Sequence, residues 1–184
     1  MPDMQAEAGT PLTHARPRRT AVVLVLAALW LGLDQLTKWW AEAALTRGEP
    51  VPVVGDLLRL HLTYNSGAAF SMGTGMTGVL TAVATVVVGV IVWQAFRTRS
   101  LAWAVTLGLL LGGALGNLTD RYLRPPSVGL GHVVDFIRLP NFPVFNVADI
   151  GITTAACLLV LLALRGVSPD GTSLEREPAG AARR

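Results

Sequence analysis

Long apolar runs alternate with short polar segments along this chain. The apolar runs cover about residues 20–40, 76–96, 101–120 and 148–164. A helix of about 20 predominantly apolar residues is long enough to cross the hydrocarbon core of a bilayer. The pattern therefore predicts four transmembrane helices.

Residues 48–75, between the first two runs, follow a different pattern. From Leu58 to Thr63 apolar and polar residues alternate, with proline and glycine at both ends of the region. Alternation with a period of two is typical of a half-buried strand. We therefore expect a small β-sheet that rests on the membrane surface.

The composition places the chain among membrane proteins. Hydrophobic residues make up 52% of it and charged residues 15%, and the mean hydropathy is +0.50. The formal net charge is +3. The arginines form short clusters beside apolar runs and do not interleave with aromatic residues, so we expect no nucleic-acid partner.

The arginine clusters also predict how the helices are oriented. Arg97 and Arg99 lie between the second and third runs, a cluster ending at Arg19 precedes the first, and Arg165 follows the fourth. Short loops rich in arginine face the cytoplasm. Both termini are therefore expected inside. The fold class is a mainly α membrane protein with a small extracytoplasmic sheet between helices one and two.

Three regions follow from this organisation. Residues 1–19 and 166–184 are polar and are expected to be disordered cytoplasmic tails, and residues 20–165 form the membrane domain. A cleaved signal peptide is the alternative for the first run, because Ala41-Glu42-Ala43 resembles a cleavage site. Trp39 and Trp40 favour the spanning helix, since they form an interfacial anchor beyond Asp34.

Polar residues interrupt the apolar chain at five places, and the predicted topology puts all five at the outer ends of the helices or in the outer loops. We therefore expect a single site. The clusters are Asp34 with Lys38, Asn65-Ser66-Gly67, Asn117 with Asp120 and Arg121, Asp135, and Asn146 with Asp149.

Asp135 and Asp149 are the candidate catalytic residues. Each stands among apolar neighbours, where a charge is costly and needs a partner or a task. Two acids held close together do not both ionise easily, so one keeps its proton while the other acts as a base. One carboxylate would then deprotonate a water that attacks a peptide carbonyl, and the other acid would protonate the leaving amine. The alternative is that both acids only cap loops and a helix start.

The other polar residues are predicted to support this pair. Asp34 and Lys38, spaced i,i+4, form either a local ion pair or part of a binding site. Arg121 directly follows Asp120 and would favour its ionised form, so we expect Asp120 to hold the helix end as a structural ion pair. The donors that would steady an oxyanion or the substrate backbone are Asn65, Asn117, Arg121 and Asn146.

Other chemistries find less support. There is no His-Glu-x-x-His pair, so we expect no metal, and Ser66 has no basic partner nearby in the sequence. Cys157, inside the last run, is interpreted as a packing residue. The small residues that would let helices approach closely are Gly108, Gly112, Gly113 and Gly116.

Five motifs, in this order, resemble those of the bacterial lipoprotein signal peptidases, also called type II signal peptidases. The resemblance extends from about Ala21 to Leu164. The motifs are Asp34–Lys38, Asn65–Ser71, Gly112–Arg121, Gly131–Ile137 and Phe145–Asp149.

The resemblance implies a four-helix aspartic peptidase of the bacterial inner membrane that cuts diacylglyceryl-modified prolipoproteins before the lipidated cysteine. It implies that Asp135 and Asp149 are catalytic, and that residues including Asn65, Gly67 and Asn117 line the site together with Arg121 and Asn146. Its partners would be this substrate, reaching an outer-face active site sideways from the lipid, and membrane lipids. No cofactor is implied, and a monomer is expected.

The chain departs from the family pattern in two loops. The segment from Arg121 to Gly131 is longer than usual, and the one from Ile137 to Asn146 is shorter. These changes affect the rim of the site more than its chemistry.

Two other classes of protein remain as alternatives. A small proton- or ion-coupled transporter also uses intramembrane carboxylates, but it would distribute them through the depth of the bundle. A scaffold protein would not need two acids among asparagine donors, and it would still work with Asp149→Asn.

Overall fold

The computed structural model describes residues 18–67 and 75–172. The tail predicted at 1–19 lies almost wholly outside the described residues, as do the end of the expected sheet region and most of the C-terminal tail. The elements in chain order are α1 (Thr20–Ala44), β1 (Val51–Val54), β2 (Leu58–Asn65), α2 (Thr77–Ala95), α3 (Leu101–Leu123), β3 (Val133–Arg138) and α4 (Val147–Leu164).

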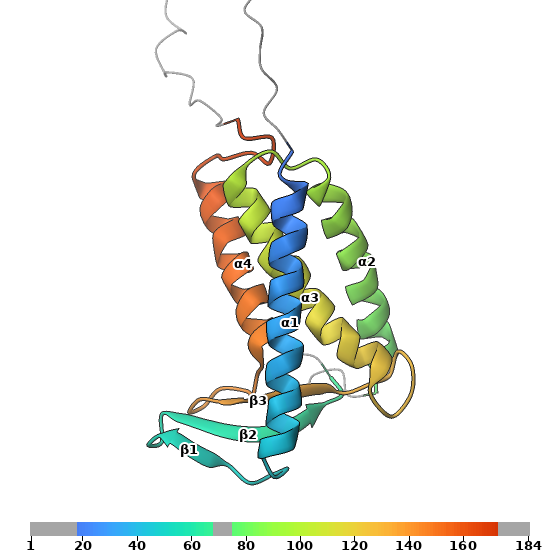
Figure 1. Cartoon of the computed structure of the whole chain (residues 1–184), viewed down its shortest axis with the longest axis vertical. Helices are drawn as coiled ribbons and strands as arrows, with labels where there is room; N and C mark the ends of the chain where they lie inside the picture. Colours follow the sequence, from blue (N-terminus) through green and yellow to red (C-terminus); the bar gives the residue numbers. More distant parts are fainter. Residues whose placement is uncertain (1–17, 68–74, 173–184) are drawn as a thin grey trace, which may run out of the picture.

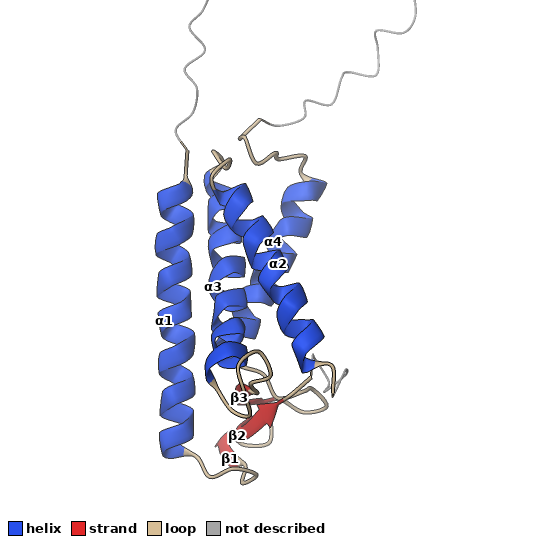
Figure 2. Ribbon diagram, turned by 90° about the vertical axis from the view of Figure 1, so that its right-hand side faces the viewer, coloured by secondary structure: helices blue, strands red, loops and turns tan. Residues whose placement is uncertain are grey.

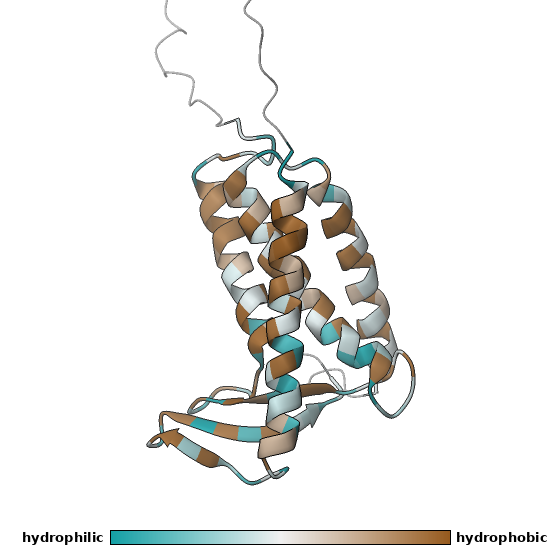
Figure 3. Ribbon diagram, in the orientation of Figure 1, coloured by the Kyte–Doolittle hydropathy of each residue, from teal (hydrophilic) through white to brown (hydrophobic). Residues whose placement is uncertain are grey.

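The four helices form a bundle with the sheet at one end (Figure 1). All four are long and apolar enough to cross a membrane, which confirms the predicted fold class. Both ends of the described chain lie at the end of the bundle opposite the sheet. Figure 3 shows hydrophobic residues over most of the helical surface, with hydrophilic residues gathered at the sheet end of α1 and α3.

Helix α3 is the centre of the bundle and packs against the other three helices (Figure 2). Its glycines make the close approaches possible. A Cβ on Gly112 would lie 2.7 Å from Trp30 Cβ, and a Cβ on Gly108 would lie 2.8 Å from Leu26 Cβ. The small-residue pattern predicted this packing correctly, since only a residue without a side chain lets α1 come so near.

The sheet has three antiparallel strands in the order β1-β2-β3. Its first two strands come from the region that alternation predicted. Strand β3 was not expected, because it follows α3 and reads as a continuous apolar run around one acid. It pairs with β2 in a register that places Thr63 opposite Asp135 and Asn65 opposite Val133.

A small core joins the sheet to α1. It consists of Ala41, Leu62, Val134 and Phe136, and Trp40 packs edge-on against Phe136 with ring centroids 6.4 Å apart. Helix α1 continues beyond Trp40 to Ala44, and Ala41 in its last turn is buried against the sheet.

Cys157 differs from its interpretation as a packing residue. Its side chain is exposed on the surface of α4. Most of the outer face of α4 is apolar and exposed in the same way, so this surface faces lipid when the helix spans the membrane.

Candidate active site

The turn between β3 and α4 brings the two candidate acids together. After β3 the chain folds back, so that Phe145 exchanges backbone hydrogen bonds with Ile137 at 2.8 and 2.9 Å. Helix α4 therefore begins beside β3. Its first turn is closed by a capping box, in which Asn146 Oδ1 accepts from the Asp149 N–H and Asp149 Oδ2 accepts from the Asn146 N–H, each at 3.1 Å.

Asp135 is held on β3 by two amide donors. Its Oδ2 accepts from Asn65 Nδ2 at 3.1 Å, and its Oδ1 accepts from Asn146 Nδ2 at 2.7 Å. The residue is only 2% exposed. Burial, and after it the negative charge of Asp149, raises the pKa of Asp135 to about 7, against the smaller opposing effect of its amide donors. This is the direction that its apolar neighbours predicted.

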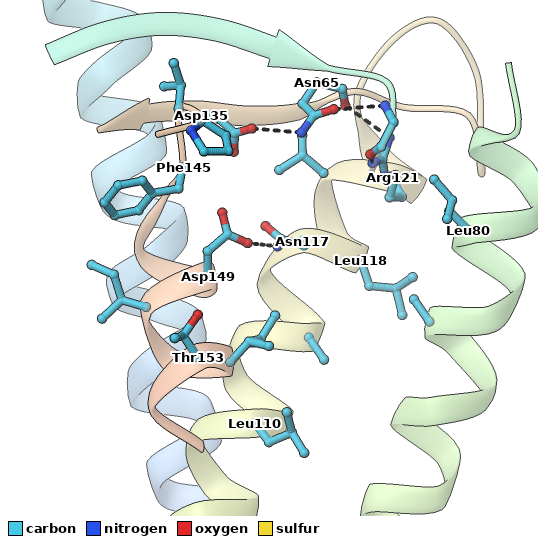
Figure 4. Close-up of a pocket in the computed structure, with 18 of the residues that line it drawn as sticks. Asn65, Leu80, Leu110, Asn117, Leu118, Arg121, Asp135, Phe145, Asp149 and Thr153 are labelled. Carbon is cyan, nitrogen blue, oxygen red and sulfur yellow. Dashed lines mark hydrogen bonds between the residues drawn. The ribbon is translucent and has the colours of Figure 1, made fainter. Parts of the chain in front are cut away.

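Asp149 has a different set of partners. Its Oδ1 accepts from Asn117 Nδ2 at 2.9 Å (Figure 4), while its Oδ2 takes part in the capping box. Its two oxygens thus accept from different kinds of donor, one from a side-chain amide and the other from a backbone N–H. Asn146 connects the two acids, because it caps the helix of one and donates to the other.

Both acids line one cavity of about 800 Å³. Its polar groups gather where β3 meets the start of α4, and its walls are apolar side chains from α2, α3 and α4, among them Leu80, Leu110 and Leu118 (Figure 4). Phe142 and Phe145 also line the cavity, and their rings meet edge to face with centroids 5.7 Å apart. The cavity is therefore suited to an extended apolar ligand with one polar segment.

Arg121 corrects one expectation. Within residues 18–67 and 75–172, its guanidinium donates to backbone carbonyls and not to Asp120: Nη1 donates to Asn65 O at 3.1 Å and to Gly131 O at 3.0 Å, and Nη2 donates to Gly67 O. Consecutive residues on a helix point in different directions, so adjacency in the sequence does not make an ion pair. Arg121 instead holds the turn that carries Asn65.

Asp34, Lys38 and Asp120 form a fully buried cluster next to Asn117, the hydrogen-bond donor to Asp149. The Lys38 Nζ lies 2.8 Å from Asp34 Oδ2 and 2.8 Å from Asp120 Oδ2, with every side chain 0% exposed. The predicted i,i+4 ion pair of Asp34 and Lys38 is therefore present, and Lys38 also pairs with Asp120 of α3. Asp120 is an ion-pairing residue as expected, with Lys38 and with Arg124 Nε at 2.8 Å.

The two acids of this cluster also hold the backbone next to the candidate catalytic pair. Asp34 Oδ1 accepts from the Ala148 N–H at 2.8 Å, one residue before Asp149. Asp120 Oδ2 accepts from the Val134 N–H at 3.1 Å, one residue before Asp135. The bundle thus positions both catalytic candidates through buried carboxylates.

Sequence reasoning missed an outer part of this network. Arg124 Nη1 donates to Glu42 at 2.6 and 2.7 Å, and Tyr64 Oη donates to Glu42 at 3.2 Å. Gln35 Nε2 donates to Gly116 O at 3.0 Å. The i,i+4 spacing of Asp120 and Arg124 was a signal for the ion pair between these two residues, but nothing in the sequence indicated the contacts of Glu42 or Gln35.

Metal ligands do not gather in the described part of the chain. Over residues 18–67 and 75–172, no three His, Cys, Asp or Glu side chains are grouped so that they could hold an ion.

A carboxyl pair at the mouth of an apolar chamber inside a helix bundle is the arrangement of a membrane-embedded aspartic peptidase. The family model described as signal peptidase (SPase) II matches residues 26–165. The chain belongs to this family.

Relatives with curated names agree. The chain is 53% identical to the lipoprotein signal peptidase of Rhodococcus jostii (strain RHA1), over 88% of this chain and 80% of that protein. It is 45% identical to the lipoprotein signal peptidase of Leifsonia xyli subsp. xyli (strain CTCB07), over 93% of this chain and 83% of that protein.

A solved structure described as a bacterial membrane enzyme superposes with a TM-score of 0.75 and 26% identity, covering 84% of this chain and 94% of that one. The family and the relatives support the peptidase prediction over the transporter alternative. This chain is accordingly a multi-pass membrane enzyme of the signal peptidase II type that acts on lipoprotein substrates.

Proposed function

We propose that this chain removes the signal peptide from diacylglyceryl-modified prolipoproteins by cutting before the lipidated cysteine, with Asp135 and Asp149 as the catalytic pair. One observation carries the proposal. Asn146 joins the two acids at the mouth of the apolar cavity, as cap of one and hydrogen-bond donor to the other.

The chemistry follows from the unequal surroundings of the acids. Asp149, which is less buried than Asp135 and accepts a backbone N–H as well as a side-chain amide, acts as the base and takes a proton from a water that attacks the scissile carbonyl. Asp135, whose pKa is raised to about 7, holds a proton near neutral pH and donates it to the leaving amine. The peptide C–N bond breaks, and the water oxygen joins the new carboxyl group.

The supporting residues act on these acids. Asn65 and Asn146 hold Asp135, and Asn117 holds Asp149. Arg121 braces the turn at Gly67. The proposal thus assigns them to positioning, where sequence reasoning had expected oxyanion donors.

The membrane arrangement of the proposal comes from charge. Arg97 and Arg99 lie at the end of the bundle opposite the acids, so the positive-inside rule puts the acids at the outer face of the cytoplasmic membrane and both termini inside. The peptidase unit is residues 20–165 and works as a monomer, because one chain supplies both acids. The substrate reaches the cavity sideways from the lipid, along the apolar walls of α2 and α4.

Cleavage of a purified diacylglyceryl-modified prolipoprotein in detergent tests this proposal. The parent should cut before the lipidated cysteine, while Asp135→Asn and Asp149→Asn should each lose about 10³-fold or more in rate, since removing one member of a catalytic unit disables the whole unit. Asp56→Asn, which changes a surface acid that is 90% exposed, should cleave like the parent.

Folded yield is checked for each variant by gel filtration. Near-parental cleavage by either folded variant would remove that acid from the mechanism. An inert parent with a confirmed lipidated substrate would overturn the proposal itself.

A further inference from the structure

Lys38 lies at the centre of the buried cluster, and one side chain, that of Asn117, connects it to Asp149. Its side chain is 0% exposed, and Nζ lies 2.8 Å from Asp34 Oδ2, 2.8 Å from Asp120 Oδ2 and 3.0 Å from Asn117 Oδ1. An ammonium group has three N–H donors. All three acceptors belong to the protein, so the donors of Lys38 are used internally and not on substrate.

The Asn117 side chain is the link between Lys38 and the acid. Its Oδ1 accepts from Lys38 Nζ and, at 3.1 Å, from Asn146 Nδ2, while its Nδ2 donates to Asp149 Oδ1 at 2.9 Å. An amide rotated by half a turn would put its NH₂ against two donors and its oxygen against a carboxylate. The hydrogen bond to Asp149 therefore requires the observed orientation.

We propose that Lys38 is a positioning residue of the reaction, which acts by holding the Asn117 amide in the orientation that donates to Asp149. A charge-assisted hydrogen bond is about twice as strong as a neutral one, so the ammonium sets this orientation more firmly than the Asn146 amide does alone. Asp34 and Asp120 compensate the buried charge that this role needs. The inference rests on the proposed function, because it presupposes that Asp149 reacts.

Arg124 provides a matched comparison. It is the other cation of the same cluster and binds Asp120 at 2.8 Å and Glu42 at 2.6 Å. In the described part of the chain its guanidinium pairs with these two acids and not with Asn117. Neutralising Arg124 therefore disturbs the same charges without acting on the amide.

A double-mutant cycle separates positioning from general stabilisation. Lys38→Met, Asn117→Ala and the double variant are compared in single-turnover cleavage with enzyme in excess, which keeps slow variants measurable. Each single change should lower the maximal single-turnover rate constant by about 10² to 10³-fold, as loss of one oriented donor does, and should leave the enzyme concentration that gives half of this rate within about threefold. The double variant should be no more than about threefold slower than the slower single variant.

The fold-losses in rate caused by Arg124→Met and by Asn117→Ala should instead multiply when the two changes are combined. The inference is overturned if the fold-losses in rate caused by Lys38→Met and Asn117→Ala also multiply. It is likewise overturned if Lys38→Met changes only the half-saturating enzyme concentration and leaves the maximal single-turnover rate constant unchanged. Loss of the dyad assignment is a separate result, since it requires activity in Asp135→Asn or Asp149→Asn. If Lys38→Met does not fold, the double variant Lys38→Met/Asp34→Asn replaces it in the cycle. The second change neutralises a carboxylate that would otherwise be buried without its partner Lys38.

Discussion

Asp135 and Asp149 lie at the same end of the bundle, but different groups surround each carboxylate. Asp135 stands in a strand between Val134 and Phe136, both buried, and accepts from two side-chain amides. Asp149 stands in the first turn of a helix and meets a backbone N–H as well. In the proposed mechanism the same residue type thus serves as the proton donor in one place and as the base in the other.

Stability should depend on pH through Asp135. Its pKa is raised from 3.8 unfolded to about 7 folded, so the folded protein binds this proton more tightly. The resulting stabilisation is fully present below about pH 4 and is lost as the pH rises through about 7. We expect the melting temperature in detergent to fall between pH 5 and pH 8, and to fall less in Asp135→Asn than in Asp56→Asn.

The same proton should limit the rate. Above pH 7 the protonated fraction of Asp135 decreases about tenfold per pH unit, so kcat/KM should decline on the alkaline side with a midpoint near 7. A profile that stays flat up to pH 9, with a substrate whose own ionisation is constant, would contradict Asp135 as the proton donor.

At the scale of elements, α3 carries the site because its glycines let two helices come close. Gly112 lies against α1, and Gly113 lies against the backbone of Ala148 in α4. This proximity allows Asp34 of α1 to reach the Ala148 N–H at 2.8 Å. The close packing of these helices therefore also sets the geometry of the site.

Gly112→Ala should destabilise the bundle. The new Cβ would lie 2.7 Å from Trp30 Cβ and 2.8 Å from Ala27 O, and overpacking of this kind costs about 1–3 kcal/mol. Thermal unfolding in detergent measures the effect. Gly89→Ala on α2 is the control, since its Cβ would have no neighbour within 4 Å; equal melting temperatures of the two variants would argue against close packing at Gly112.

At the scale of the whole molecule, the cavity extends from the polar mouth along the inner faces of three helices. Ala84 of α2 lines this space, as does Thr154 of α4. Helix α2 packs mainly on α3, and the walls that face one another across the cavity are apolar. A signal helix that lay there would exchange lipid contacts for protein contacts at little cost in solvation.

Ala84→Trp should therefore obstruct the substrate. We expect kcat/KM to fall at least about tenfold, equivalent to about 1.4 kcal/mol, mainly through a higher KM, because the indole occupies volume that the substrate needs. Val86→Trp, at a position 68% exposed on the outer face of the same helix, should cleave normally. An equal loss in both variants would indicate damage to α2 and not obstruction of the cavity.

Much of this architecture is local in origin. Hydrophobic run length determines the four spanning helices, and residue alternation determines β2, since each depends on the solvent that nearby side chains meet. The capping box of Asn146 and Asp149 is likewise a short-range pattern. Five motifs in order were enough to indicate the family, and the family match over residues 26–165 agrees.

Only the tertiary structure decided which polar groups meet. Strand β3 exists because β2 offers it an edge, and the contacts of Lys38 with Asp120 and Asn117 join residues about 80 positions apart (residues 38, 117 and 120). The sequence order suggested Arg121 as the partner of Asp120, but helix geometry turns Arg121 to the Asn65 turn. In a buried site each donor takes whichever acceptor the packing of the helices brings within reach, and sequence neighbours do not determine that packing.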